Sequence, residues 1–149
     1  MNLDKFIILE LIPTNFKSYG GSIIQLSALK IKNMKLESRF DYRIKDECLP
    51  IPEMLEFINY DKDYFTYVED ESEIINKFKE YVGNYPLLFI YDKYTKDYLE
   101  YLDNNTYNIL KYLKLDYNKN VINDIIEKYN LEPSNHIVDL LYEALMMEY

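Results

Sequence analysis

A wholly apolar run, Phe6-Ile7-Ile8-Leu9, lies near the start of the sequence. Such a run is typical of a strand that is covered on both faces. The strand is expected to end near Ile12, because Pro13 removes a backbone donor from the ladder. The sequence therefore predicts a central strand close to its start.

Two further strands and one return strand are predicted around this central strand. Residues 22–31 and 36–44 should form a hairpin beside it, joined by a tight turn. The buried strand that returns later is expected at 86–91.

Most of the remaining sequence has helical spacing. Pro52 is placed to open a short helix, PEMLEFI. Ser72 is a candidate N-cap for a second helix, whose apolar stripe ends at Gly83. Further helices are expected at 95–102, 106–113, 121–129 and 137–145. Three strands, a helix, a strand and a helical tail predict an α/β fold with a mixed sheet. At 149 residues, a single domain spanning 1–149 is expected.

Charge and composition restrict the possible functions. Seventeen basic and twenty-six acidic residues give a net charge of −9, and only two residues are arginine. Strong nonspecific binding of DNA depends on basic residues, so we expect weak or no direct nucleic-acid binding. One cysteine and one histidine exclude a disulfide framework and a multi-histidine metal site. No apolar run reaches the roughly 18 residues of a membrane span, and the start does not read as a signal peptide, so a cytoplasmic protein without membrane contact is expected.

Several strings, in their order and spacing, resemble the DEDDh-type 3′–5′ exonucleases. FIILELIPT resembles the strand that ends in Asp-x-Glu in that family, and 23–31 is similar to its second strand. LLFIYDKYTKDYL resembles the later strand and loop, while 106–113 and 120–131 resemble the helices before the last motif. The resemblance implies a ribonuclease-H-like mixed sheet with flanking helices.

The same resemblance implies a catalytic set that is only partly present. Family members hold two divalent metals with four carboxylates, and a histidine activates water. Glu10 falls on the first aspartate, but the expected glutamate is Ile12, which cannot bind a metal. The second aspartate falls on Thr95 or Lys96. Two carboxylates lie near this second position, at Asp92 and Asp97.

The end of the chain keeps one further carboxylate. Asp139 falls on the last aspartate, which places Ser134 on the histidine position. Aligning His136 instead would put Leu141 where the aspartate belongs, so no single register keeps both. If Lys96 points into the site, its ammonium group could offset the charges of the remaining carboxylates.

These substitutions favour a catalytically inactive exonuclease-like domain that acts by binding and needs no cofactor. An inhibitor or adaptor for a protein with a basic, nucleic-acid-binding face would suit the acidic charge. The candidate contacts are acidic residues in two clusters, Asp61 and Asp63, then Glu69, Asp70, Glu71 and Glu73. Such clusters are also common as plain solvated surface.

The alternative is a weak or divergent 3′–5′ exonuclease acting on DNA or RNA. It would hold Mg²⁺ or Mn²⁺ with Glu10, Asp139 and either Asp92 or Asp97.

Overall fold

The computed structural model of the protein describes residues 3–44, 68–134 and 136–149. Its strands form one mixed sheet in the order β4-β3-β2-β1-β5-β6. The strands are β1 (Lys5–Pro13), β2 (Ile23–Lys32), β3 (Lys35–Ile44), β4 (Val68–Glu69), β5 (Leu87–Phe89) and β6 (Thr106–Asn108). The first three pair antiparallel, whereas β4, β5 and β6 each join a neighbour in parallel.

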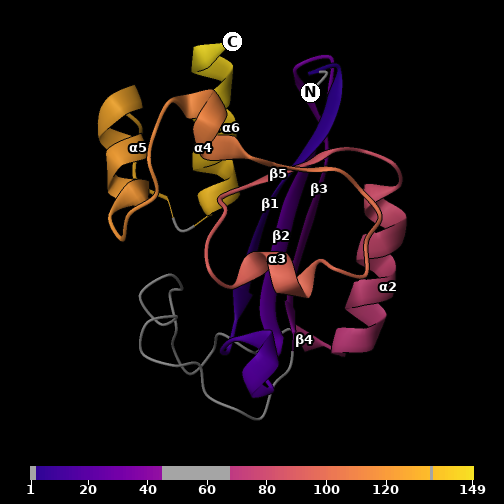
Figure 1. Cartoon of the computed structure of the whole chain (residues 1–149). Helices are drawn as coiled ribbons and strands as arrows, with labels where there is room; N and C mark the ends of the chain where they lie inside the picture. The colour runs from indigo at the N-terminus through magenta and orange to yellow at the C-terminus, as the bar shows by residue number, and fades with distance from the viewer. Residues whose placement is uncertain (1–2, 45–67, 135) are drawn as a thin grey trace.

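Helices cover both faces of this sheet (Figure 1). They are α2 (Glu71–Val82), α3 (Thr95–Tyr98), α4 (Ile109–Leu113), α5 (Val121–Tyr129) and α6 (Ile137–Glu148), with a short 3-10 turn, η1, at Lys17–Tyr19. α2 lies on one side, and α4, α5 and α6 lie on the other. No helix in the described part of the chain is long and apolar enough to cross a membrane.

The central strand β1 divides the core into two layers because its side chains alternate between the faces. Ile7, Leu9 and Leu11 pack with α2 and α3, whereas Phe6 and Ile8 pack with α4, α5 and α6. The predicted strand covered on both faces is therefore confirmed. It runs through Pro13, with a register irregularity between Ile12 and Pro13.

Residues 106–108 correct one prediction, since they form a strand and not the start of a helix. Thr106 and Asn108 pair in parallel with β5, and the Asn108 side chain then accepts a hydrogen bond from the Leu110 backbone at 3.2 Å. Because of this sheet pairing and this cap, the helix begins only at Ile109. Helical periodicity alone could not detect the available sheet edge.

Smaller differences concern helix ends. The helix predicted at 95–102 is a single turn, α3, and the N-cap position of α2 is Asp70 and not Ser72. The two-residue strand β4 was not predicted. The helix expected after Pro52 lies outside the described residues.

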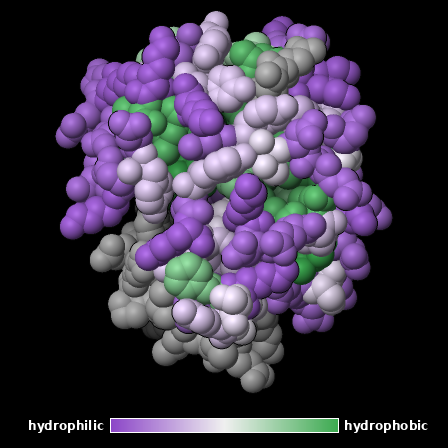
Figure 2. Space-filling model, in the orientation of Figure 1, coloured by the Kyte–Doolittle hydropathy of each residue, from purple (hydrophilic) through white to green (hydrophobic). Residues whose placement is uncertain are grey.

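The face of the molecule shown in Figure 2 is mostly hydrophilic, with hydrophobic side chains in separate small areas. This distribution agrees with a polar surface and a core that lies between the helices and the sheet.

Candidate functional site

A row of polar residues crosses the three long strands. Glu10 in β1 is opposite Ser27 in β2, and Ser27 is opposite Asp41 in β3. Directly opposed residues project from the same face of a sheet. Because Ile8 packs against α4, α5 and α6, the period of two places the Glu10 row on that face as well.

The carboxylate of Glu10 is the most unusual group in this row. Both of its oxygens are buried and accept no hydrogen bond from the residues that the structure describes. Burial is the main cause that raises the Glu10 pKa from 4.5 to about 8, and the negative charges of Asp41 and Asp139 raise it further. Glu10 is therefore mostly protonated at neutral pH.

Asp139 approaches the same region from the first turn of α6. Arg39, from β3, donates to its two carboxylate oxygens at 2.7 and 3.4 Å. The side chains of Arg39 and Asp139 are 43% and 30% exposed, so the pair lies at the surface beside Glu10 and not beneath it. The chain thus supplies its own cation to the carboxylate that sequence analysis placed at the last metal-ligand position.

Lys96 does not take this neutralising position. It is exposed, and its Nζ lies over the ring of Tyr91, 5.5 Å from the ring centroid. The hypothesis that Lys96 lies between Glu10 and Asp139 is therefore wrong; the cation that pairs with Asp139 is Arg39, in the third strand.

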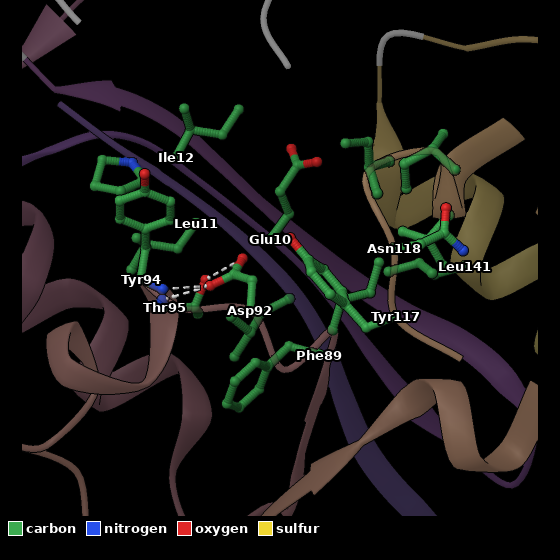
Figure 3. Close-up of a pocket in the computed structure, with 16 residues that line it drawn as sticks. Glu10, Leu11, Ile12, Phe89, Asp92, Tyr94, Thr95, Tyr117, Asn118 and Leu141 are labelled. Carbon is green, nitrogen blue, oxygen red and sulfur yellow. Dashed lines mark hydrogen bonds between the residues drawn. The ribbon is translucent and has the colours of Figure 1, made fainter. Parts of the chain in front are cut away.

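A pocket of about 80 Å³ opens beside Glu10. Glu10, Ile12, Asp92 and Thr95, which sequence analysis assigned to three of the ligand positions and their surroundings, all line it (Figure 3). Figure 3 shows the Glu10 carboxylate between Ile12 and the helix that carries Leu141. The predicted site residues on β1 and on the loop after β5 thus meet in one place.

Asp92 lines this pocket, but its hydrogen bonds are local. Its Oδ1 accepts from the backbone N–H groups of Tyr94 and Thr95 at 2.8 and 2.7 Å, and its Oδ2 accepts from the Thr95 hydroxyl at 2.9 Å. These bonds hold the start of α3, and Thr95 is buried there. Asp97, by contrast, is exposed and does not line the pocket.

The predicted histidine position is also away from the pocket. Ser134 and His136 are both exposed, and the Ser134 hydroxyl accepts a hydrogen bond from the His136 backbone at 3.0 Å. Neither residue lines the pocket. Among the described residues, no histidine lines the pocket beside Glu10.

The donor set does not fit a two-metal centre. Ile12 offers no ligand. The Asp92 carboxylate accepts hydrogen bonds at the start of α3, and Asp139 is paired with Arg39. No group of three or more His, Cys, Asp or Glu side chains among the described residues is arranged to hold a metal ion. Since Mg²⁺ requires several hard oxygen ligands in near-octahedral geometry, these residues do not match that requirement.

Sequence analysis missed Arg39 and Asp41 as site residues. Both belong to the predicted strand 36–44 and lie on one face of it, because they are two positions apart. Asp41 accepts a hydrogen bond from the Ser27 hydroxyl at 2.7 Å, and Ser27 in turn accepts one from Gln25 at 3.3 Å. Polar alternation in this strand was the available signal, and the register with β1 was the missing information.

The second acidic cluster lies at the start of α2. Asp70 is the N-cap residue, and Glu71 and Glu73 are in the first turn. Negative charge is favourable at this end of a helix, so these residues have a structural role. Glu69 belongs to β4, while Asp61 and Asp63 lie outside the described residues.

Several solved nucleases share this architecture. Cell-death related nuclease 4 matches with a TM-score of 0.66 at 13% identity, over 97% of this chain. Exonuclease I in complex with the inhibitor BCBP matches with a TM-score of 0.73 at 11% identity, over 99% of this chain. The chain has an exonuclease I-like fold. The zinc-bound form of the E. coli exonuclease I complex with single-stranded DNA also matches, with a TM-score of 0.67, 12% identity and 97% coverage.

The chain spans less than two thirds of the length of these structural neighbours. It spans 62% of the cell-death related nuclease chain, and 41% and 39% of the two exonuclease I chains. No protein-family model and no curated protein matches the sequence. The likeness confirms the predicted α/β, ribonuclease-H-like fold, and at these identities it describes the fold alone.

Proposed function

We propose that this protein is a catalytically inactive exonuclease-like domain that acts by binding another protein. The observation that carries the proposal is the Arg39–Asp139 ion pair, which occupies the carboxylate expected to bind metal. Ile12 and Thr95 support the proposal, because they line the pocket at the other expected positions without offering a carboxylate. A fold persists when its catalytic groups are replaced, so activity has to be argued from the site.

The test is a nuclease assay on single- and double-stranded DNA and RNA, in Mg²⁺ and in Mn²⁺. We expect no hydrolysis above background. Glu10→Gln and Asp139→Asn would serve as the diagnostic variants, with Glu80→Gln as a matched control because Glu80 lies exposed on α2. Reproducible trimming that is lost in the first two variants and kept in the control would overturn the proposal.

One observation favours the alternative of a weak or divergent nuclease. The Glu10 carboxylate has no hydrogen-bond partner among the described residues, and the negative charge of Asp139 lies close enough to raise its pKa. A divalent metal there would compensate both groups. Thermal melting during a Mn²⁺ titration tests this, since free metal at 100 Kd stabilises the native state by about 2.7 kcal/mol. The alternative requires a saturable rise in Tm that Asp139→Asn abolishes, and the proposal requires none.

The proposed partner has a basic face, of the kind used to bind nucleic acid. The support is electrostatic: the net charge is −9, and Asp70, Glu71 and Glu73 gather at the start of α2. Charge complementarity mainly speeds association and is screened by salt. We therefore expect binding to arginine- and lysine-rich peptides that weakens steeply with added salt. Affinity that does not change with salt would contradict this mode of binding.

A further inference from the structure

The pocket beside Glu10 combines a buried carboxylate with mostly apolar walls. Ile12, Ile122, Ile137 and Leu141 line it together with Tyr117. Its volume is about 80 Å³, well above the roughly 10–15 Å³ that one water probe occupies. The pocket therefore has room for a group that is larger than one water molecule.

The charges around Glu10 favour a cation as the occupant. Asp41 and Asp139 both act on the Glu10 carboxyl, and its two oxygens have no hydrogen-bond donor among the described residues. A carboxylate left buried without a partner is costly, and a bound cation that donates hydrogen bonds removes that cost. Because the carboxylates do not form a metal-binding group, the occupant should bring its own donors.

Guanidinium suits these walls better than ammonium does. It is planar, it is weakly hydrated, and it donates two parallel hydrogen bonds to one carboxylate. Apolar walls can also cover the aliphatic part of an arginine side chain, which packs well on such surfaces. The protein already uses this chemistry beside the pocket, where Arg39 bonds to both oxygens of Asp139.

The chain has no spare arginine for Glu10. It contains two arginines in all. Arg39 is bound to Asp139, and Arg43 has interactions of its own. A guanidinium group at Glu10 must therefore come from another molecule.

We infer that the Glu10 pocket binds an arginine side chain of a protein partner. Binding releases the Glu10 proton to solvent, the resulting carboxylate accepts two N–H groups of the guanidinium, and the apolar side chains around it cover the methylene groups. The inference rests on the proposed function, whose protein partner it describes chemically, but it does not depend on the acidic cluster of α2.

The experiment is an NMR titration of the full chain, labelled at isoleucine and leucine methyl groups, in alkaline buffer. The probes are N-acetyl-arginine amide, the lysine equivalent and the citrulline equivalent, which has nearly the shape of arginine without its charge. We expect saturable shifts at Ile12, Ile122, Ile137 and Leu141 with the arginine probe. Its Kd should be at least tenfold lower than the Kd of either other probe.

Two variants test whether the methyl shifts come from binding at Glu10. Glu10→Gln should abolish the saturable shifts, and Glu80→Gln should leave them unchanged, because Glu80 lies on α2 and not at the pocket. The methyl spectrum of each variant shows whether it is folded. The comparison of arginine with citrulline uses the unaltered protein, so it stays decisive even if Glu10→Gln does not fold.

Each negative outcome has a distinct meaning. Equal affinity for arginine and citrulline, or for arginine and lysine, would overturn the inference. Shifts confined to the start of α2 would also overturn it, while the salt-dependent mode of partner binding would stand. Nuclease activity in the separate assay would refute the proposed function. It would not change what the arginine, lysine and citrulline titrations say about the Glu10 pocket.

Discussion

The two faces of β1 differ in chemistry although they belong to one strand. Ile7, Leu9 and Leu11 face an apolar layer formed with α2 and α3. On the other face, Phe6 and Ile8 continue the core under α4, α5 and α6, but the next position is the carboxyl of Glu10. One face is therefore built for packing over its whole length, and the other changes at Glu10 from packing to a polar site.

This difference separates what maintains the fold from what defines the site. Burial of apolar surface stabilises the α2 face, whereas the buried carboxyl on the opposite face costs stability when it is ionised. The fold can therefore resemble that of exonuclease I whatever groups lie around Glu10. Substitutions on the two faces should consequently have opposite effects on the free energy of unfolding.

The largest effect is expected for Phe78→Ala on the α2 face. Phe78 is fully buried and contacts Phe40, with ring centroids 5.2 Å apart. Its truncation leaves a cavity and should lower the free energy of unfolding by roughly 3–5 kcal/mol, measured by chemical denaturation. Asn76→Ala is the control, because Asn76 is exposed on the same helix and should change stability by less than about 0.5 kcal/mol. Similar losses in both variants would show that the α2 face does not dominate stability.

Glu10→Gln should raise the free energy of unfolding at neutral and alkaline pH, which is the opposite of the effect of Phe78→Ala. The Glu10 carboxyl titrates near 8 in the folded protein, against a reference pKa of 4.5. Between these values the folded state holds more protons than the unfolded state, so the free energy of unfolding falls as pH rises, by up to about 1.4 kcal/mol per pH unit. At pH 7 the accumulated contribution is on the order of 3 kcal/mol.

Denaturation at several pH values from about pH 5 to pH 8 would measure this contribution as a slope. Glu10→Gln should flatten the slope, and Glu80→Gln should keep it. Parallel pH profiles for Glu10→Gln and the unaltered protein would mean that Glu10 is not buried as the structure shows.

A smaller effect is expected for Asp92→Ala at the edge of the pocket. The substitution removes the acceptor for three hydrogen bonds at the start of α3 and should cost about 1–2 kcal/mol. Asp97→Ala should change stability little, because Asp97 is exposed. If Asp92→Ala instead abolished a Mn²⁺-dependent rise in Tm, Asp92 would be a metal ligand and not a cap.

The smallest effect on stability is expected for Arg39→Gln. The Arg39–Asp139 pair is partly exposed, and such pairs contribute less than about 1 kcal/mol. The variant should also show no nuclease activity on DNA or RNA, since freeing Asp139 provides no ligand at Ile12 or Thr95. Nuclease activity gained by Arg39→Gln would show that the ion pair alone blocks a competent site.

The main features of the fold were predictable because they depend on local patterns. The unbroken apolar run at 6–9 indicates a covered central strand, and the hairpin pattern at 22–44 indicates its neighbours. The short strands were harder, because Val68 and Thr106 are in strands through parallel pairing with partners far along the chain. Their own sequence carries little strand signal.

The site was predictable only in part. Glu10, Ile12 and Thr95 were placed by their order along the chain, and the structure brings all three to one pocket. Arg39 and Asp41 were missed because their relation to Glu10 depends on the register of three strands. Lys96 was considered as the compensating cation, but the direction of an exposed side chain cannot be read from sequence.

The sheet order also has a consequence for the growing chain during synthesis. The β1–β2–β3 meander needs only residues up to Ile44, whereas the helices that cover its two faces end at Val82 and Glu148. At usual ribosomal speeds, roughly 5–20 s separate the end of the meander from the end of α6. A sheet that formed in that interval would have an uncovered apolar face and a bare edge at β1, the site that β5 fills in the complete fold. A chaperone that binds exposed strands would find its target in such a sheet, before the Glu10 pocket could form.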